Sequence, residues 1–244
     1  MRMRLDRWLT ALGVCSRSEG KTLIRAGAVR VNGKPAGDPA ETFETEGTPL
    51  SVRGQPVDGR VVRHVMLNKP AGVLTAARDK KQRTVMDLLP PVYGSIGCMP
   101  VGRLDRDTTG LLLLSCDGEL NHRLLSPGRH VDKLYEAEVT GKLTEKEIQS
   151  FAEGLELHDF TALPAELEIL RAGEAASLAR VTVREGKYHQ IKRMFAASGH
   201  EVLTLRRLRF GPLELDPDLA EGAWRELRPE ELEALRQAAG MTPG

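Results

Sequence analysis

The chain has 244 residues, which is enough for one sizeable hydrophobic core and a small additional domain. Hydrophobic residues make up 41% and charged residues 28%, and no run approaches the roughly 18 apolar residues of a membrane span, so a transmembrane protein is excluded. The formal net charge of +1 hides a basic first 34 residues, with eight Lys/Arg against two acids, and an acidic stretch over residues 213–244, with eight acids against three arginines.

The N-terminus, MRMRLDRW, reaches charged residues at once and has no apolar signal segment. The three cysteines, Cys15, Cys98 and Cys116, form no CxxC or other metal-binding spacing. These features predict free thiols, no metal site, no membrane association and a cytoplasmic protein.

The first 35 residues predict two short helices followed by a hairpin. Leu5, Leu9 and Leu12 recur at helical spacing, and Ser16 or Ser18 can cap a second helix. The segment AVRVNGKPA then alternates apolar and basic residues into an Asn-Gly pair, the strongest short hairpin signal.

After this hairpin the sequence becomes polar and rich in proline and glycine. The polar segment GDPAETFETEGTP leads to one more expected strand at residues 50–52, and the proline and glycines of RGQPVDGR predict a linker over residues 53–61. We therefore divide the chain into domains 1–60 and 61–244.

The second domain mixes strand-like and helical patterns. Apolar runs predict strands at residues 62–67, 111–114, 135–139, 179–183 and 202–205, and helical patterns lie near residues 118–125, 144–153, 189–197 and 229–239. The alternation is too irregular for a βαβ repeat, so we expect an α+β fold with a largely antiparallel sheet.

Basic residues of the first domain are expected along one surface of its second helix and hairpin: Arg17, Lys21, Arg25, Arg30 and Lys34. Such a surface suits the phosphates of structured RNA, although scattered basic residues also form ordinary solvated faces. The segment from Arg4 through VRVNGKPA closely resembles an S4 domain, a small RNA-binding module, over roughly residues 2–60. This resemblance favours the RNA-binding interpretation.

The most informative stretch of the second domain is PVGRLDRDTTGLLLLSCDGEL, at residues 100–120. It resembles the catalytic motif of the pseudouridine synthases, in which Asp105 matches the catalytic aspartate. Arg103 matches its neighbour, and the resemblance implies that Arg103 fills the space vacated by the extruded uridine. The segment HVMLNKPAGVLT resembles the first strand motif of the same family.

Two later segments continue this resemblance in the order of the family. VDKLYEAEV resembles the segment that supplies a tyrosine, here Tyr135, that stacks on the target base. REGKYHQIKRMF resembles the motif that supplies a basic partner for the aspartate, here Lys192. His189 and Arg193 share a helical face with Lys192, a basic surface available for a phosphate or a carboxylate.

The chemistry that this resemblance implies needs no cofactor. Pseudouridine is an isomer of uridine, so no electrons leave and no group is lost, and the sequence has no motif for a nicotinamide, a flavin or a metal. The apolar run GLLLLS after Asp105 would exclude water, and a cation such as Lys192 would keep the carboxylate ionised.

Other interpretations compete with this one. Asp105 and Asp107 could form a paired-carboxylate hydrolase site, but no second acidic cluster or histidine set accompanies them. A non-catalytic S4 RNA-binding protein also fits the first domain, but Asp105 is present together with Tyr135 and Lys192. An aminoacyl-tRNA synthetase fragment could carry the same module, but the sequence lacks the HIGH-like and KMSKS-like nucleotide motifs of that class. Arg206, Arg207 and Arg209 form either a further basic stripe in the RNA cleft or a solvated edge strand.

Within the pseudouridine synthases, an S4 domain followed by a short catalytic domain resembles the RsuA family, which acts on single sites in ribosomal RNA. SPGRHVDKLYEAEV and GLELHDFTALPAELEIL are most similar to its small-subunit members. The resemblance implies that the target is uridine 516 of 16S ribosomal RNA, free or in a small-subunit assembly intermediate. We expect the chain to act as a monomer. A site in 23S ribosomal RNA is the alternative.

Overall fold

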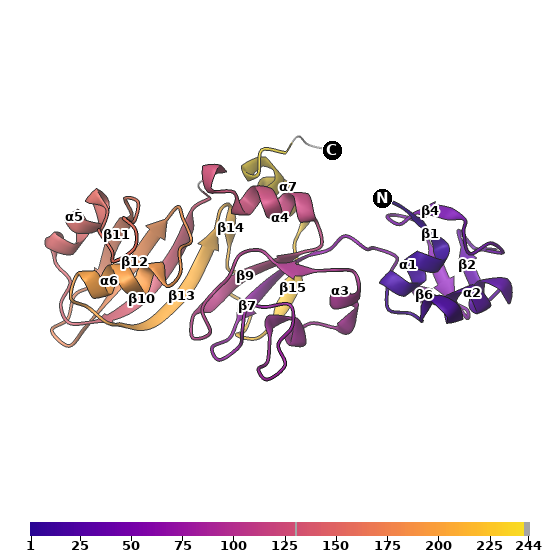
Figure 1. Cartoon of the computed structure of the whole chain (residues 1–244), viewed down its shortest axis with the longest axis horizontal. Coiled ribbons are helices and arrows are strands. Elements are labelled where there is room, and N and C mark those ends of the chain that lie inside the picture. The colour runs from indigo at the N-terminus through magenta and orange to yellow at the C-terminus, as the bar shows by residue number, and fades with distance from the viewer. Residues whose placement is uncertain (130, 242–244) are drawn as a thin grey trace. The chain divides into compact units, whose positions relative to one another are not determined.

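The computed structural model describes residues 1–129 and 131–241, so His130 and residues 242–244 of the second predicted domain lie outside the described residues. The chain forms two compact units (Figure 1). The N-terminal unit comprises Met1–Arg63 together with the short segments Leu89–Met99 and Ser115–Asp117, and the second unit contains most of the rest.

The N-terminal unit combines short helices with two small sheets. Its elements are β1 (Arg2–Arg4), α1 (Leu5–Ala11), α2 (Arg17–Arg25), β2 (Val29–Val31), β3 (Lys34–Pro35), β4 (Thr42–Glu44), β5 (Leu50–Val52), β6 (Gln55–Val57) and α3 (Pro91–Ser95). β1 pairs with β4, and the other strands form a sheet in the order β3-β2-β5-β6. The predicted helix–helix–hairpin is present, and β1 and β4 are additional to it.

Local sequence explains these elements. Ser16, one of the two expected caps, begins α2 with a reciprocal capping box to Glu19. The predicted turn between β2 and β3 places Asn32 at φ 52° and Gly33 at φ 75°, the left-handed geometry that a tight hairpin requires.

The predicted linker over residues 53–61 is wrong in its first half, because Gln55–Val57 forms β6 and pairs with β5. Arg53 and Gly54 make a second left-handed turn, which returns the chain along β5. β6 is an edge strand, where Pro56 is tolerated although it has no N–H to donate.

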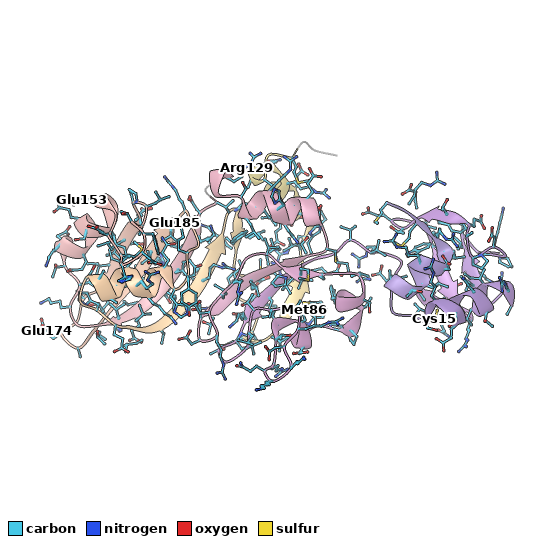
Figure 2. All side chains as sticks on the ribbon, in the orientation of Figure 1. Cys15, Met86, Arg129, Glu153, Glu174 and Glu185 are labelled. Atoms are coloured by element: carbon cyan, nitrogen blue, oxygen red, sulfur yellow. The ribbon has the colours of Figure 1, made fainter. Side chains whose placement is uncertain are left out.

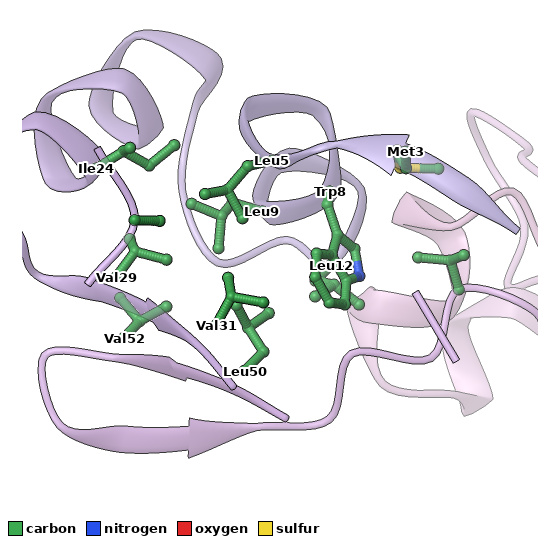
Figure 3. Close-up of a cluster of buried hydrophobic side chains, with 12 residues drawn as sticks. Met3, Leu5, Trp8, Leu9, Leu12, Ile24, Val29, Val31, Leu50 and Val52 are labelled. Atoms are coloured by element: carbon green, nitrogen blue, oxygen red, sulfur yellow. The ribbon is translucent and has the colours of Figure 1, made fainter. Parts of the chain in front are cut away.

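One apolar cluster holds the N-terminal unit together (Figure 3). Leu5, Trp8 and Leu9 of α1 are fully buried against Val29 of β2 and Leu50 of β5. The indole Nε1 of Trp8 also donates to the carbonyl of residue 59 at 2.6 Å, which fixes the chain where it leaves the unit.

The second unit is built on a nine-stranded sheet. Its strands are β7 (His64–Lys69), β8 (Met99–Pro100), β9 (Thr109–Ser115), β10 (Lys133–Thr140), β11 (Glu166–Arg171), β12 (Ala176–Val183), β13 (Val202–Phe210), β14 (Leu213–Glu214) and β15 (Trp224–Glu226). The main path runs β11-β12-β10-β13-β9-β7-β15. Pairs β11–β12, β12–β10, β10–β13, β13–β14 and β7–β15 are antiparallel, and β13–β9 is parallel. The predicted α+β fold with a largely antiparallel sheet is confirmed.

The helices of this unit are η1 (Val85–Leu88), α4 (Gly118–Leu125), η2 (Pro127–Arg129), α5 (Glu145–Glu153), α6 (Gln190–Ala197) and α7 (Pro229–Ala238). They include two neighbouring pairs, α4 with α7 and α5 with α6 (Figure 1). Leu120 of α4 and Leu235 of α7 share a buried cluster with Leu111 of β9 and Phe210 of β13. The rings of Phe151 in α5 and Phe195 in α6 lie 5.0 Å apart, so these two helices pack together.

The interpretation of residues 206–209 as a solvated edge is wrong for Arg207. β13 lies inside the sheet between β10 and β9, and Arg207 is 1% exposed. Its Nε donates to the carbonyl of Leu111 at 2.7 Å, and its guanidinium lies over the Phe210 ring. Alternation along the strand leaves Arg206 exposed, so only part of this basic run faces solvent.

Candidate active site

A pocket in the second unit collects the predicted catalytic side chains of that unit. Its lining residues come from the loop before β9, from β10 and β13, and from β12 with the loop and helix that follow it. They are Arg103, Leu104, Asp105, Thr108, Tyr135, Val183, Glu185, Gly186, Lys187, His189, Gln190, Ile191, Lys192 and Leu205. Figure 2 labels Glu185, which accepts a hydrogen bond from Gln190 at the start of α6.

The loop that carries Asp105 is held in place by hydrogen bonds to the segment that follows β7. The hydroxyl of Thr75 donates to the carbonyl of Leu104 at 2.8 Å and accepts from the Leu104 N–H at 3.2 Å. The N–H of Gly72 donates to the carbonyl of Arg106 at 2.8 Å. These bonds hold the backbone on both sides of Asp105 and restrict where its carboxylate can lie.

Lys69 provides a third clamp from inside the protein. Its side chain is fully buried, and its Nζ donates to the carbonyls of Pro70, Arg106 and Thr108 at 3.0, 3.2 and 2.9 Å. Burial lowers the pKa of Lys69 to about 8, while the negative charges of Asp107 and Asp105 act in the opposite direction.

Sequence reasoning missed Lys69 and Thr75 as site residues. Both lie in HVMLNKPAGVLT, a segment whose resemblance to the family was noted but whose side chains were given no task. A lysine one residue beyond the apolar run VML was the available signal, because such a residue is buried only when partners compensate it.

The strand after this loop begins with a close approach between backbones. Gly110 has a φ of 98°, and a Cβ at this position would lie 2.3 Å from the carbonyl oxygen of Arg207. Only glycine therefore lets β9 start beside β13, and the Thr-Thr-Gly sequence fixes the point at which the loop becomes strand.

Asp105 lies between two basic side chains of the α6 region. Its carboxylate is 3.5 Å from Nε2 of His189 and 3.8 Å from Nζ of Lys192, and its side chain is 27% exposed. His189 precedes α6 with a φ of 50°, a left-handed conformation that histidine adopts more readily than most residues. The carboxylate is thus partly desolvated and faces positive charge.

Lys192 lies closer to Asp107 than to Asp105. Its Nζ donates to both carboxylate oxygens of Asp107 at 2.6 Å, and this bond holds the pKa of Asp107 below its usual value. The expected proximity of Lys192 to Asp105 is present at 3.8 Å, but the lysine serves two carboxylates. Asp107 is therefore part of the site, as the neighbour that shares the cation.

Arg193, assigned to RNA from the sequence, is engaged inside its own unit. It pairs with Asp159 and lies 4.9 Å from the centre of the Phe160 ring. The three basic residues at the start of α6 thus each face a carboxylate of the same unit: Asp105, Asp107 or Asp159.

Tyr135 lines the pocket from β10. It is 8% exposed, and it pairs with Val181 of β12 on one side and with Arg207 of β13 on the other. Tyr135 is thus almost wholly buried, and what remains exposed of it lies at the pocket, where a base could contact it.

The remaining predicted RNA-binding residues are exposed. Arg103 is exposed at the pocket, and the residues expected in the first domain lie on the surface of the N-terminal unit: Arg17, Lys21, Arg25, Arg30 and Lys34. Arg17 lies 3.5 Å from the buried carboxylate of Asp6, and Arg30 donates to the carbonyl of Gly33 at 3.0 Å.

Within residues 1–129 and 131–241, no group of three or more His, Cys, Asp or Glu side chains is arranged to hold a metal ion. No helix in the same residues has both the length and the apolar composition that crossing a membrane requires.

Relatives of known family match almost the whole chain. An RNA pseudouridine synthase of Bacillus subtilis, YtzG, is 44% identical over 96% of this chain and 99% of its own length. The ribosomal small subunit pseudouridine synthases A of Pseudomonas aeruginosa and Escherichia coli are 39% and 37% identical, over 94% of this chain and 99% and 98% of theirs.

A crystal structure of a pseudouridylate synthase matches with a TM-score of 0.67 and 33% identity, over 96% of this chain and 99% of the other. The S4 domain family matches residues 3–47, and the RNA pseudouridylate synthase family matches residues 63–197. Because the second match spans the Asp105 loop, Tyr135 and Lys192, and the relatives match over nearly their whole length, this chain belongs to the RNA pseudouridylate synthase family.

Proposed function

We propose that this chain isomerises a single uridine of ribosomal RNA to pseudouridine, with Asp105 as the catalytic carboxylate. The placement of Asp105 carries the proposal. Its carboxylate is partly buried at a pocket and lies 3.5 Å from His189 and 3.8 Å from Lys192. A carboxylate that is held in place beside basic side chains can act on the sugar or on the base.

The reaction balances without any added component. The bond from ribose C1′ to N1 breaks, the base turns, and C1′ bonds to C5. The proton on C5 is then lost, and N1 carries a proton in the product. No atom or electron is gained or lost overall, so the tasks left to the protein are to hold the base, to supply the carboxylate and to move one proton.

Tyr135 has the position for two of these tasks. Tyr135 lines the same pocket as Asp105, and its ring can hold the detached base while the base turns from N1 to C5. Its hydroxyl is a weak acid or base that can exchange a proton with C5. Tyr135→Phe keeps the ring and removes the hydroxyl, so a larger loss in turnover than in binding would assign the proton to Tyr135.

The proposed substrate is 16S ribosomal RNA at uridine 516, free or in a small-subunit assembly intermediate. Support comes from two relatives whose names give the small ribosomal subunit, both more than a third identical over nearly their full length. The name of the Bacillus subtilis relative gives no target, so 23S ribosomal RNA is a distinct outcome of the test.

The exposed basic residues of the N-terminal unit support docking onto structured RNA. Five cationic side chains, on α2 and on the hairpin of β2 and β3, face solvent. Arg103 is exposed at the pocket and is proposed to enter the space that the target uridine leaves.

The test is to map pseudouridines in ribosomal RNA from cells that lack this protein. We expect loss of one pseudouridine in 16S ribosomal RNA, restored by the wild-type chain and not by Asp105→Asn. Loss of a site in 23S ribosomal RNA would identify the alternative substrate. An unchanged map in all ribosomal RNA would contradict the proposed function.

A further inference from the structure

Tyr188 presents an aromatic ring to solvent beside the pocket. Its side chain is 76% exposed, the largest value among the exposed large hydrophobic residues that the structure describes. It lies in the turn between β12 and α6, flanked by the pocket-lining residues Lys187 and His189. A single exposed apolar residue is ordinary in proteins, so exposure alone carries no function.

A second observation connects this ring to the reaction centre. The rings of Tyr188 and His189 are stacked, with centroids 3.9 Å apart and an interplanar angle of 17°. Nε2 of the same histidine is 3.5 Å from the carboxylate of Asp105. One face of Tyr188 therefore packs on a residue that touches the proposed catalytic carboxylate, and the rest of the ring is open.

The charge beside Tyr188 suits a nucleic acid. Lys187 is exposed, lines the pocket and lies 5.5 Å from the centre of the Phe160 ring. Arg193 shares that ring but pairs with Asp159. In the part of the chain that the structure describes, Lys187 has no ion-pair partner, so its charge is available to a phosphate.

We propose that the open face of Tyr188 stacks on the nucleobase next to the target uridine, and that Lys187 pairs with the phosphate between the two nucleotides. Turning a uridine out of its stack deprives the neighbouring base of a stacking partner. An exposed aromatic ring can replace that partner and is indifferent to which base it meets. The proposal deepens the proposed function and rests on it.

This arrangement assigns Tyr188 to binding and not to proton transfer. Its hydroxyl is not required, because the stack uses the ring face. Tyr188→Phe should therefore keep the stack, whereas Tyr188→Ala should lose it. Leu170→Ala is the matched control, since Leu170 is 39% exposed on β11 and does not line the pocket.

The experiment uses the full chain and a stem-loop of 16S ribosomal RNA containing uridine 516. The fluorescent base 2-aminopurine replaces first the nucleotide before the target uridine and then the nucleotide after it. Binding is followed with the Asp105→Asn background, so that no reaction changes the signal. Stacking on Tyr188 should quench the fluorescence at one of the two positions.

We expect Tyr188→Ala to remove this quenching and to weaken RNA binding about tenfold, a change typical of losing one aromatic–base stack. The Tyr188→Phe variant and the Leu170→Ala control should keep both the quenching and the affinity. In the reactive background, the single-turnover rate at saturating RNA should fall less than about threefold for Tyr188→Ala.

Two results would overturn the proposal. Quenching and affinity that survive in Tyr188→Ala would remove the stack, and a lowered saturating rate at unchanged affinity would make Tyr188 a support for His189 instead. Turnover by the wild-type chain on the same RNA tests the proposed function separately. Turnover without quenching contradicts only the stack, whereas absent turnover contradicts the substrate and this inference with it.

Discussion

The basic side chains of the N-terminal unit and those around the pocket are arranged in opposite ways. Lys21, Arg25 and Lys34 are exposed and, within the described residues, form no ion pair. At the pocket, in contrast, His189 faces Asp105 and Lys192 faces Asp107. Unpaired surface cations attract a polyanion and release its counterions, whereas paired and partly buried ones orient specific carboxylates.

This difference separates two functions that the net charge of +1 conceals. Binding through exposed cations weakens as salt rises, because salt screens exposed charges from one another beyond a Debye length of about 10 Å at 0.1 M ionic strength. Ion pairs that are partly withdrawn from water are screened much less. Changes in the N-terminal unit should therefore alter affinity and its salt dependence, and changes at the pocket should alter the rate.

The largest expected effect comes from Asp105. Replacement by asparagine keeps the shape but removes the charge, so turnover should fall by at least about 10³-fold while RNA affinity stays within a few fold. Asp107→Asn is the matched control, since Asp107 is 71% exposed and shares the same cation. Its expected loss is only a few fold. Single-turnover rates of both variants measure these losses. Equal losses in the two variants would refute the assignment of Asp105 as the catalytic carboxylate.

Lys192 should have the next largest effect. Lys192→Met leaves Asp105 and Asp107 without their shared ammonium, and we expect a loss in the saturating rate on the order of 10²-fold. It should also raise the pKa of Asp107, which the Lys192 hydrogen bond now holds down.

The double variant Lys192→Met with Asp107→Asn sharpens this prediction, because it removes the uncompensated carboxylate as well. If Lys192 acts through charge balance at Asp105, the double variant should recover part of the lost rate. If the losses of the two single variants, expressed as activation free energies, add up in the double variant, Lys192 and Asp107 act independently.

The N-terminal unit gives a smaller effect on a different quantity. A variant in which glutamine replaces four cationic residues, Lys21, Arg25, Arg30 and Lys34, should bind RNA roughly tenfold or more weakly at low salt. The slope of its log affinity against log salt concentration should fall by up to about 3. The saturating rate should change less than about threefold. Binding isotherms at two salt concentrations measure this, and an unchanged slope would exclude the unit as the docking surface.

Charge neutralisation is a cleaner test than deletion of residues 1–60. Ile96, just after α3, packs against the apolar cluster that Trp8 and Leu9 form, so deletion would expose an apolar surface on what remains. Weaker RNA binding by the truncated protein would then also report poor folding, whereas four exposed side chains can be replaced without disturbing that cluster.

Most of the elements followed from periodicity and local signals. The helices predicted at residues 118–125 and 144–153 appear as α4 and α5, and Thr144 is the cap of α5. Glu166–Arg171 and Trp224–Glu226 were missed as strands. Both end the main path of the sheet and carry charged residues, and Trp224–Glu226 is only three residues long and pairs with β7, far away in sequence. Pairing of that kind is decided by tertiary context.

The geometry of the site was harder to predict from the sequence than the fold was. Asp105, Tyr135 and Lys192 were predicted from motifs, and their meeting at one pocket depends on strand order that no local pattern specifies. The sharing of Lys192 between Asp105 and Asp107 was missed, because a loop geometry set by backbone bonds to Lys69 and Thr75 places both carboxylates there. Arg207 was misjudged because a charged residue on an interior strand looks the same in sequence as one on an edge.

The smallest effect concerns the buried clamp under the Asp105 loop. Lys69 has a pKa of about 8 in the folded chain, against 10.5 as its ordinary value. Between these two values the unfolded chain holds more protons, so the free energy of unfolding contributed by Lys69 rises with pH in that window. Lys69→Met leaves three carbonyls without their donor and should be less stable than the wild type.

The stability gap between wild type and Lys69→Met should widen by about 1.5 kcal/mol from about pH 8 to about pH 9.5, since one pKa unit corresponds to about 1.4 kcal/mol. Denaturant unfolding at these two pH values measures it. Lys133→Met is the matched control, because burial also lowers the pKa of Lys133 to about 8, although among the described residues its Nζ donates only to the carbonyl of Val131. Both variants should share the pH dependence, and only Lys69→Met should also lower the saturating rate, because only Lys69 holds the loop of Asp105. A gap that stays constant with pH would mean that Lys69 keeps its proton throughout, and that the three carbonyls and two carboxylates near it offset its burial completely.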